Sequence, residues 1–316
     1  MRDGPIPLVS VVVPAFNSER TIRQAIDSAL NQTHPRLEVI VCDDASTDGT
    51  AQVVASIHDE RVILLRNQAN RGPGPARDRA IAEARGEYIA MLDADDAWLE
   101  SRIETLIAES NAGEIVFDDL MLCHDVGDRM LPSVPVHGTK AFGSHGMATI
   151  VTLPCFLASD RLVIQPIIPT SHIRRLNLKH SGRRFGEDAE FYINLALDGI
   201  PFRYVPRPLY LYRVTPGSLT ADPASTGAMQ RMLLQFLESP DLPDDIRGAL
   251  IDKITRVDLD SCAHALARQL RNGRIFSASA LIARNPRVIG RIIERFPRYL
   301  KYEIHRQVMR IPKRKQ

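Results

Sequence analysis

Three carboxylates occupy four consecutive positions of the chain, in the run Asp93-Ala94-Asp95-Asp96. Carboxylates this close repel one another unless a cation or strong hydrogen-bond donors neutralise them. Oxygen-only ligands favour a hard cation such as Mg²⁺ or Mn²⁺, which keeps positions open for phosphate oxygens. The alternative is an acidic start to the following helix, because a helix dipole stabilises carboxylates in its first turn. Taken alone, the run is compatible with either interpretation.

Asp43 and Asp44 form a second acidic site, directly after the apolar run from Leu37 to Cys42. A carboxylate at such a position can accept the imide N–H of a uracil ring. Ser46 and Asp48 follow closely, and their types are typical of turn and helix-cap residues. We therefore assign Asp44 to a ligand and the two later residues to the local turn.

The segment Pro14-Ala15-Phe16-Asn17 closes the first apolar run of the chain. An aromatic side chain at this point could stack on a nucleotide base, although a phenylalanine can equally belong to the core. No G-x-G-x-x-G pattern follows the run, which argues against a dinucleotide-binding site.

Two further groups of residues could serve a ligand or only the fold. Gly72-Pro73-Gly74 lies between Arg71 and Arg77. Glycine permits close backbone approach, and a guanidinium suits phosphate oxygens or base edges. Arg77 is equally suited to be a structural partner of Asp93 or Asp44. Glu187-Asp188 could be stabilised by a helix dipole, or could supply a general base that faces a metal site.

The elements that must position these groups alternate between strand and helix. Apolar, β-rich runs predict strands at 9–13, 37–42, 62–65 and 88–92, with amphipathic helices between them. This alternation predicts an α/β fold with a mostly parallel central sheet flanked by helices. Ligands of such sheets bind outside the carboxyl ends of the strands, where Asn17, Asp44 and the acidic run all fall. Their common position favours a ligand site over an acidic helix start.

The pattern becomes mixed beyond residue 113. Strands are predicted at 115–117, 202–205 and 209–213, and a helix from 187 to about 197. Scattered Gly, Pro and His over 124–160 predict loops, and helices are expected after about residue 225.

Bulk properties limit the class of protein. The chain has 316 residues, 44% hydrophobic and 25% charged, which is typical of a globular protein. A net charge of +2 argues against nucleic acid as a partner, and the four cysteines show no zinc spacing. The first residues predict a strand rather than a signal peptide, and no run of about 18 apolar residues predicts a membrane span. We therefore expect a cytoplasmic protein.

The end of the chain is basic. Residues 274–316 hold twelve Lys or Arg against two Glu, and apolar and aromatic residues interleave with the cations over 286–311. Such segments bind anionic membrane surfaces, which predicts peripheral attachment to the inner face of the cell membrane through 286–316. The alternatives are apolar faces that pack on the rest of the chain, or binding to nucleic acid, which no recognised module supports.

These motifs together resemble the family-2 glycosyltransferases of the GT-A fold. The resemblance is carried by Val11–Asn17, Asp43–Thr50, Asn70–Gly72 with Ala76-Arg77, Gly86–Ile89 and Asp93–Asp96, in order and spacing. It covers residues 8–120 and continues more loosely to about 220, through Gly186–Asp188 and Tyr212-Arg213. The second half is similar to bacterial exopolysaccharide transferases of the succinoglycan type. We therefore expect a GT-A domain over 1–225 and a helical, basic extension over 226–316.

The resemblance implies an inverting enzyme that transfers sugar from a nucleotide-diphosphate sugar to a saccharide or lipid-linked acceptor. Asp188, beside Glu187, would be the catalytic base. Asp95, with Asp96, would bind a Mg²⁺ or Mn²⁺ ion that bridges the diphosphate. The donor would be held by the residues Pro14, Ala15, Phe16, Asn17, Asp44, Arg71, Arg77, Asp93, Ala94 and Arg213. Among them, Asp93 would lie near the ribose.

One position departs from the family pattern, and two other classes remain as alternatives. Asp78 stands where the family usually has Asn after the arginine, which adds a charge near the sugar site. A sugar nucleotidyltransferase would need a Gly-rich basic loop after the first strand, where this chain has Pro-Ala-Phe-Asn-Ser-Glu. A non-catalytic nucleotide-sugar sensor would not need the complete acidic run together with Glu187-Asp188.

Overall fold

The computed structural model describes residues 5–111, 113–127, 129–138, 141–215, 224–271, 283 and 285–290. The chain divides into two compact units, Met1–Pro216 and Gly217–Gln316. Most of the predicted basic segment 286–316 lies outside the described residues, as does the boundary region around 216–223.

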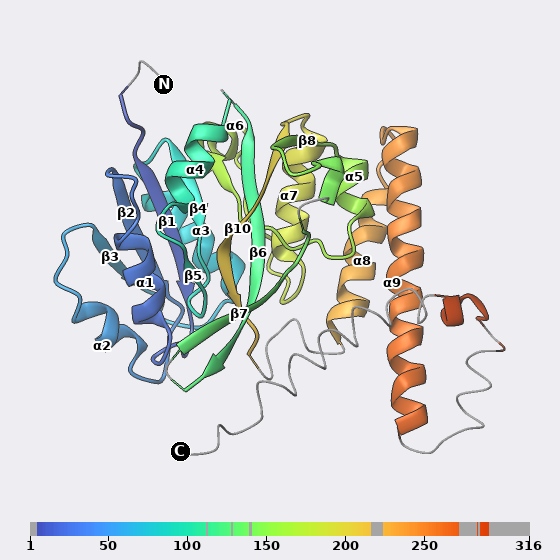
Figure 1. Cartoon of the computed structure of the whole chain (residues 1–316), viewed down its shortest axis with the longest axis horizontal. Helices are drawn as coiled ribbons and strands as arrows, with labels where there is room; N and C mark the ends of the chain where they lie inside the picture. Colours follow the sequence, from blue (N-terminus) through green and yellow to red (C-terminus); the bar gives the residue numbers. More distant parts are fainter. Residues whose placement is uncertain are drawn as a thin grey trace. The chain divides into compact units, whose positions relative to one another are not determined.

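The first unit is built on a ten-stranded sheet, and its N-terminal half is parallel (Figure 1). Four strands lie there in the order β3-β2-β1-β4. They are β1 (Val9–Ala15), β2 (Leu37–Asp43), β3 (Val62–Arg66) and β4 (Tyr88–Met91). The connecting helices are α1 (Ile22–Leu30), α2 (Thr50–Ala55) and α3 (Pro73–Glu83). This half has the predicted strand–helix alternation.

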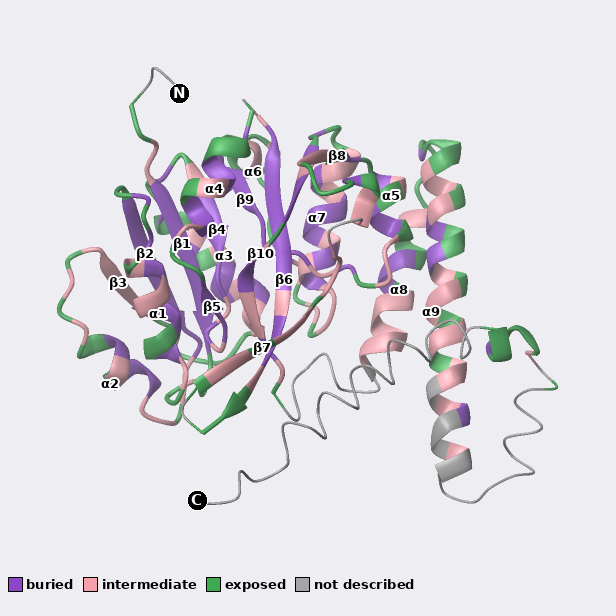
Figure 2. Cartoon of the chain, viewed as in Figure 1, coloured by how far each residue is buried: buried purple, intermediate pink, exposed green. Residues whose placement is uncertain are grey.

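The inner parallel strands β1, β2 and β4 are buried, as Figure 2 shows, whereas the edge strand β3 is half-buried. Every residue of β1 and β2 is buried, which is expected of parallel strands covered by helices on both faces. Their register pairs Val9 with Leu37 and Ala15 with Asp43, so the two strands end side by side. The segments that follow them, which begin at Phe16 and Asp44, therefore leave the sheet at the same edge.

The second half of the sheet is mixed. It continues from β4 through β9 (Ile167–Pro169), β6 (Ile115–Val126), β10 (Phe202–Arg213) and β5 (Ala97–Trp98). β9 is antiparallel to both β4 and β6, whereas β6 and β10 are parallel. The remaining helices of this unit are α4 (Arg102–Glu109), α5 (Leu153–Ala158), α6 (Thr170–Leu176) and α7 (Glu187–Leu197).

Residues 124–160 are not the loops that the sequence predicted. They contain β7 (Arg129–Pro135), a 3₁₀ turn at Ala141–Gly143, β8 (Thr149–Val151) and α5. β7 pairs with β6 and β8 with β10, both at positions off the main strand path. β7 contains two prolines, which an outer strand tolerates because a missing N–H there need not break a ladder. Those prolines concealed the strand in the sequence.

β10 is likewise one strand where two were expected. Its pairing with β6 shifts register between Val205 and Pro208 and again between Pro208 and Tyr210. Pro206 and Pro208 lack the N–H that a regular ladder needs, so the strand passes them with an irregularity instead of ending. The strand therefore continues to Tyr210 and Arg213.

The described part of the second unit is helical. It contains α8 (Ala224–Leu237) and the 28-residue α9 (Asp244–Arg271). Among the described residues, no helix combines the length and apolar character needed to cross a membrane.

Candidate active site

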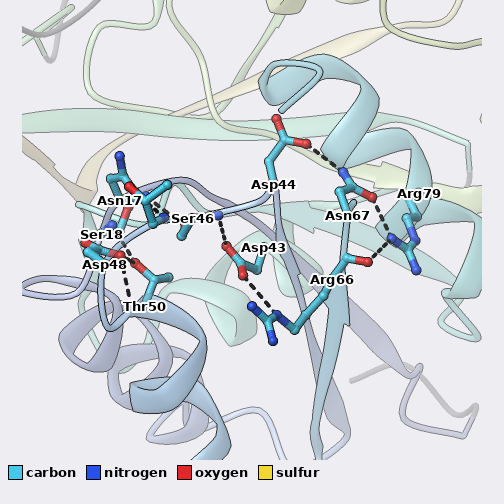
Figure 3. Close-up of polar contacts among 11 residues, drawn as sticks. Asn17, Ser18, Asp43, Asp44, Ser46, Asp48, Thr50, Arg66, Asn67 and Arg79 are labelled. Carbon is cyan, nitrogen blue, oxygen red and sulfur yellow. Dashed lines mark hydrogen bonds and ion pairs between the residues drawn. The ribbon is translucent and has the colours of Figure 1, made fainter. Parts of the chain in front are cut away.

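Asn17 and the turn after β2 form one connected group at the carboxyl ends of the first two strands (Figure 3). The Asn17 backbone N–H donates to Ser46 Oγ at 2.9 Å, and its side-chain oxygen accepts from Thr47 N at 2.9 Å. Asn17 has φ +50°, in the left-handed region that asparagine tolerates better than most residues. Asn17 thus fixes the turn beside the predicted base site.

Asp44 organises the loop that precedes α3. Its Oδ1 accepts from Asn67 Nδ2 at 2.6 Å, and its Oδ2 accepts from the backbone N–H groups of Arg71 and Gly72 at 2.9 and 2.8 Å. Gly72 has φ +93°, a value that residues with a side chain rarely adopt. The glycine therefore lets the loop turn here towards Asp44. A carboxylate has about four acceptor sites, and these three bonds still leave capacity for a ligand N–H.

The aromatic side chain beside Asp44 faces solvent. Phe16 is 47% exposed, whereas Pro14 is buried and Ala15 is 2% exposed. An exposed phenylalanine that follows a fully buried strand does not contribute to the core. The core interpretation of Phe16 is therefore wrong, and the ring is free to stack on a planar ligand.

Asp93 is held by side chains from two other parts of the first unit. Its Oδ1 accepts from Arg77 Nη2 and its Oδ2 from Gln165 Nε2, both at 2.8 Å. Its backbone N–H donates to Tyr210 Oη at 3.1 Å. The carboxylate is 26% exposed, so it remains open to solvent on one side.

Asp96 is almost completely buried, at 2% exposure. Its Oδ2 accepts from Tyr210 Oη and its Oδ1 from the backbone N–H of Arg213, both at 2.7 Å. Burial raises the pKa of Asp96 well above its usual range, and the charges of Asp95 and Asp93 add to this effect. Both oxygens thus already bind groups of β10.

Asp95 carries the more accessible carboxylate beside Asp96. Burial and the charge of Asp93 raise its pKa to about 6, against weaker opposing effects of Arg213 and the Thr215 hydroxyl. A divalent cation would relieve this repulsion, because it stabilises the charged form of every carboxylate nearby. Among the described residues, no three His, Cys, Asp or Glu side chains are grouped as a metal cage. One or two carboxylates plus substrate phosphates are nevertheless a common arrangement for Mg²⁺.

Arg213 connects the acidic run to two other elements. Its Nε donates to the Asp95 carbonyl at 2.5 Å, its Nη2 donates to Gln24 of α1, and its Nη1 pairs with Asp125 of β6. The residue is only 7% exposed. These contacts make Arg213 a support of the acidic run. Ala94, within the run, is 5% exposed.

Arg77 joins the acidic run to the second half of the unit. Its Nη2 donates to Asp93 at 2.8 Å, and its Nη1 donates to Glu187 Oε1 at 2.9 Å. Of the two structural partners considered for Arg77, Asp93 is confirmed, whereas no hydrogen bond or ion pair to Asp44 is observed. The guanidinium is 8% exposed, so it bridges two carboxylates away from most solvent.

Glu187 and Asp188 begin α7 on the other side of Arg77. Burial and the adjacent Asp188 raise the pKa of Glu187 to about 7, while Arg77 lowers it. Burial also raises the pKa of Asp188, against the charge of Arg77. Asp188 accepts from the N–H of Ala189 at 2.7 Å, which uses one of its two oxygens. A carboxylate with a raised pKa next to an anchored cation is suited to general-base chemistry.

Sequence reasoning missed three residues that support the acidic run: Gln165, Tyr210 and Arg102. Arg102 is fully buried, donates to both oxygens of Asp118 and lies 5.1 Å above the Tyr210 ring. Its guanidinium also contacts the carbonyl of Gln165. Arg102 therefore braces Gln165 and Tyr210, two of the three residues that bind Asp93. The only hint in the sequence was an arginine at the start of an otherwise amphipathic helix.

Solved structures identify the fold. The chain is similar to S. aureus TarS 1-349 in complex with UDP, with TM-score 0.60 and 22% identity over 79% of this chain and 71% of that one. It is also similar to the mannosyltransferase PcManGT from Pyrobaculum calidifontis in complex with GDP-Man and Mn²⁺, with TM-score 0.60 and 19% identity over 89% and 81% of the two chains. The fold is the GT-A fold of glycosyltransferases.

Sequence comparison then gives the family. Residues 10–142 match the model described as Glycosyl transferase family 2, and the chain therefore contains a domain of that family. The succinoglycan biosynthesis protein ExoO of Rhizobium meliloti (strain 1021) is 33% identical over 228 residues, which are 68% of this chain and 63% of that protein. The UDP-Glc:alpha-D-GlcNAc-diphosphoundecaprenol beta-1,3-glucosyltransferase WfaP of Escherichia coli is 39% identical over 110 residues, 35% of this chain and 44% of that protein. The chain thus spans less than two thirds of these relatives.

Proposed function

We propose that the protein is an inverting glycosyltransferase. It moves a sugar from a nucleotide-diphosphate sugar to a saccharide or lipid-linked saccharide in exopolysaccharide or cell-surface glycan synthesis. The observation that carries the proposal is the bridge made by Arg77. One buried guanidinium joins Asp93, in the acidic run, to Glu187, next to Asp188. A donor-binding group and a potential general base are thereby held at one centre, as sugar transfer requires.

The donor is proposed to be a UDP-sugar. Phe16 offers an exposed ring for stacking, and Asp44 has acceptor capacity for the uracil imide N–H. Pro14, Ala15 and Asn17 shape the same edge, and Asp93 would meet the ribose. Arg71, Arg77, Ala94 and Arg213 complete the proposed donor site. WfaP is named as a user of UDP-Glc, and the TarS structure contains UDP, which supports this choice.

We place Mg²⁺ or Mn²⁺ at Asp95, with Asp96 beside it. Such an ion supplies Lewis-acid stabilisation of the negative charge that develops on the leaving diphosphate. Burial and the charge of Asp93 raise the pKa of Asp95 to about 6, and the repulsion between the two carboxylates supports a cation there. Asp96 anchors the acidic run to β10, since its two oxygens accept hydrogen bonds from Tyr210 and from the backbone N–H of Arg213.

Asp188 is the proposed catalytic base, and Glu187 accepts the hydrogen bond that anchors Arg77. Asp188 takes the proton of an acceptor hydroxyl while the hydroxyl oxygen attacks the anomeric carbon. The bond from that carbon to the diphosphate breaks as the new bond forms, so the configuration at the carbon inverts. Arg77 keeps Glu187 and Asp93 neutralised during this step, which leaves Asp188 as the accessible base.

The acceptor is proposed to be a saccharide carried on a lipid diphosphate, presented at an anionic membrane surface. WfaP is named for such an acceptor, which supports the class. The basic and aromatic composition of 286–316 supports attachment to the surface, on the cytoplasmic side of the cell membrane.

The test is release of UDP from UDP-glucose with Mn²⁺, with and without an undecaprenyl-diphosphate-linked GlcNAc acceptor. The purified protein should release UDP, whereas a sensor would only bind the donor. Asp188→Asn should keep the donor affinity but lose at least about 100-fold in turnover, the usual worth of a general base. Near-normal turnover of Asp188→Asn would remove Asp188 from the mechanism. If no nucleotide sugar is turned over, the assignment as an enzyme fails.

A further inference from the structure

Asp78 and the buried His180 form a pair between α3 and the segment that precedes α7. Asp78 lies on α3, one position after Arg77, and His180 lies in the segment that leads into α7. The His180 Nδ1 lies 2.7 Å from Asp78 Oδ1, and the His180 backbone N–H lies 3.1 Å from both oxygens of Asp78. The His180 side chain has no exposed surface.

The partner of Nδ1 fixes the protonation of the ring. An ionised carboxylate only accepts hydrogen bonds, so Nδ1 must carry the hydrogen that is donated to Asp78. Burial lowers the pKa of His180, against the opposing effect of Asp78, and the ring is therefore neutral near pH 7. Its Nε2 then carries a lone pair. Nε2 is buried and has no hydrogen-bond partner among the described residues.

The ring is held in one orientation. It stacks on Phe191 of α7, with 4.1 Å between the ring centroids and 8° between the planes. Gly74 of α3 lies against the same segment, since a Cβ added there would be 2.9 Å from His180 Cβ and 3.3 Å from Glu187 Cγ. The close contact with α3 therefore places both the histidine and the Glu187-Asp188 pair.

Asp188 lies three positions before Phe191 on α7, so the proposed base and the ring that stacks on His180 lie on the same side of that helix. After burial and the Asp78 hydrogen bond, the charges that affect the His180 pKa are those of Arg77, Asp78 and Asp188. Burial raises the pKa of Asp188, while Arg77 and His180 oppose this rise. The titratable and charged groups around Asp188 are Arg77 of α3, Asp93 of the acidic run, Glu187 and Tyr192 of α7, and the His180 ring.

We propose that His180 is a positioning residue for Asp188. Its Nε2 accepts a hydrogen bond from the Asp188 carboxyl group, directly or across one water, once Asp188 has taken the proton of the acceptor hydroxyl. The proton stays on Asp188, and the electron pair of the acceptor oxygen forms the new glycosidic bond as the diphosphate departs. Asp78 holds the ring for this contact. The inference rests on the proposed function, because it presupposes that Asp188 is the base.

Two substitutions at His180 separate its two nitrogens. In His180→Asn the amide N–H can still donate to Asp78, but nothing replaces Nε2. In His180→Gln the longer side chain can return an acceptor oxygen near the position of Nε2. His34→Asn is the matched control, because His34 is also buried and its Nε2 contacts a backbone carbonyl, that of Pro7, at the amino end of β1.

The measurement is UDP release from UDP-glucose with Mn²⁺ between pH 5 and 9. His180→Asn should lower kcat by about 10-fold with KM for the donor unchanged, since small misplacements of a catalytic group cost up to about 100-fold. The acid limb of its plot of kcat against pH should move to lower pH. The protonated form of Asp188 has then lost the Nε2 acceptor that stabilises it, so the pKa of Asp188 falls. His180→Gln should recover part of both effects, and His34→Asn should show neither.

Wild-type kcat and an unshifted acid limb in His180→Asn would overturn the inference, as would an equal loss in His34→Asn or a rise in KM that accounts for the whole effect. If His180→Asn does not fold, Asp78→Ala decides, because it leaves the ring unanchored and should shift the acid limb in the same direction.

Asp188→Asn separates the two proposals. If it abolishes UDP release while His180→Asn does not affect it, only this inference fails. If Asp188→Asn is fully active, the proposed base itself is wrong.

Discussion

Arg77 is the residue on which both halves of the proposed site depend. Its two ion pairs, to Asp93 and Glu187, have N–O distances of 2.8 and 2.9 Å, and none of the three side chains is more than 26% exposed. Breaking a buried ion pair leaves an unpaired charge, which costs about 3–5 kcal/mol. Arg77→Met leaves two such carboxylates, so we expect the free energy of unfolding to fall by about that amount.

Urea denaturation of the Arg77→Met variant measures this change. The control is Arg61→Met, which breaks the pair of Arg61 with Asp59, where the side chains are 36% and 26% exposed. Such surface pairs contribute about 0–1 kcal/mol. An equal loss of unfolding free energy in the two variants would show that the Arg77 bridge stabilises the protein no more than a surface ion pair does.

Glu187 should make stability depend on pH. Its pKa in the folded protein is about 7, above the ordinary value of 4.5, chiefly because of burial. The folded state therefore binds this proton more tightly than the unfolded state does. The resulting stabilisation is complete below pH 4.5 and is lost as the pH rises through 7. Glu187→Gln should flatten the dependence of the unfolding free energy on pH between 5 and 7.5, and an unchanged slope would contradict the raised pKa.

Asp95 should decide the metal dependence of donor binding. Replacing Asp95 by Ala removes the proposed metal-binding carboxylate, while Asp93 and Asp96 keep their protein partners. We expect Asp95→Ala to bind UDP equally with and without Mn²⁺ in calorimetry, whereas the unmodified protein should bind more tightly with the metal. The assignment fails if the variant keeps the full enhancement by Mn²⁺.

At the scale of elements, α3 is the helix that places the site. Its first turn packs so closely on the segment before α7 that a methyl group at Gly74 would lie 2.9 Å from His180 Cβ and 3.0 Å from the Ser181 carbonyl. Gly74→Ala gains helix propensity of about 1 kcal/mol but overpacks the contact, which costs about 1–3 kcal/mol. We expect a net loss of stability together with reduced UDP release.

Gly248 of α9 gives the matched comparison for Gly74. Nothing lies within 4 Å of a Cβ added at Gly248. Gly248→Ala should therefore show the helix propensity gain alone, about 1 kcal/mol in the free energy of unfolding. If Gly74→Ala were stabilising to the same extent, the close packing of α3 would be wrong.

The elements also show where sequence reasoning succeeded and where it stopped. β1, β2, β3 and β4 each carry a local apolar pattern, and their helical connections make them parallel, so the strands, their parallel direction and their polar ends could be predicted. Tyr210 and Gln165 contact Asp93 from 117 and 72 residues away. No local pattern encodes such contacts. Within β10, Pro206 and Pro208 made the sequence look like two strands, whereas one continuous strand brings Tyr210 to the acidic run.

At the scale of the whole molecule, the basic end of the chain supplies a separate prediction. If 286–316 binds anionic lipid, its deletion should abolish sedimentation with phosphatidylserine-containing vesicles at low salt, because each cation near the surface contributes about 1 kcal/mol. The intact protein should bind less as ionic strength rises, since salt screens such attraction. UDP release from soluble donor should remain. Unchanged vesicle binding by the truncated protein would exclude this segment as the attachment site.

The Arg77 bridge has a thermodynamic consequence for the pH dependence of donor binding. A ligand that draws Asp93 or its counter-charge away from Arg77 changes the charge balance felt by Glu187 and Asp188, and so their affinity for protons. Linkage is reciprocal: if donor binding changes the proton affinity of the α7 carboxylates, then pH must change donor affinity by the matching factor. Donor binding measured in buffers of different ionisation enthalpy would therefore report a proton exchange that originates one helix away from the nucleotide.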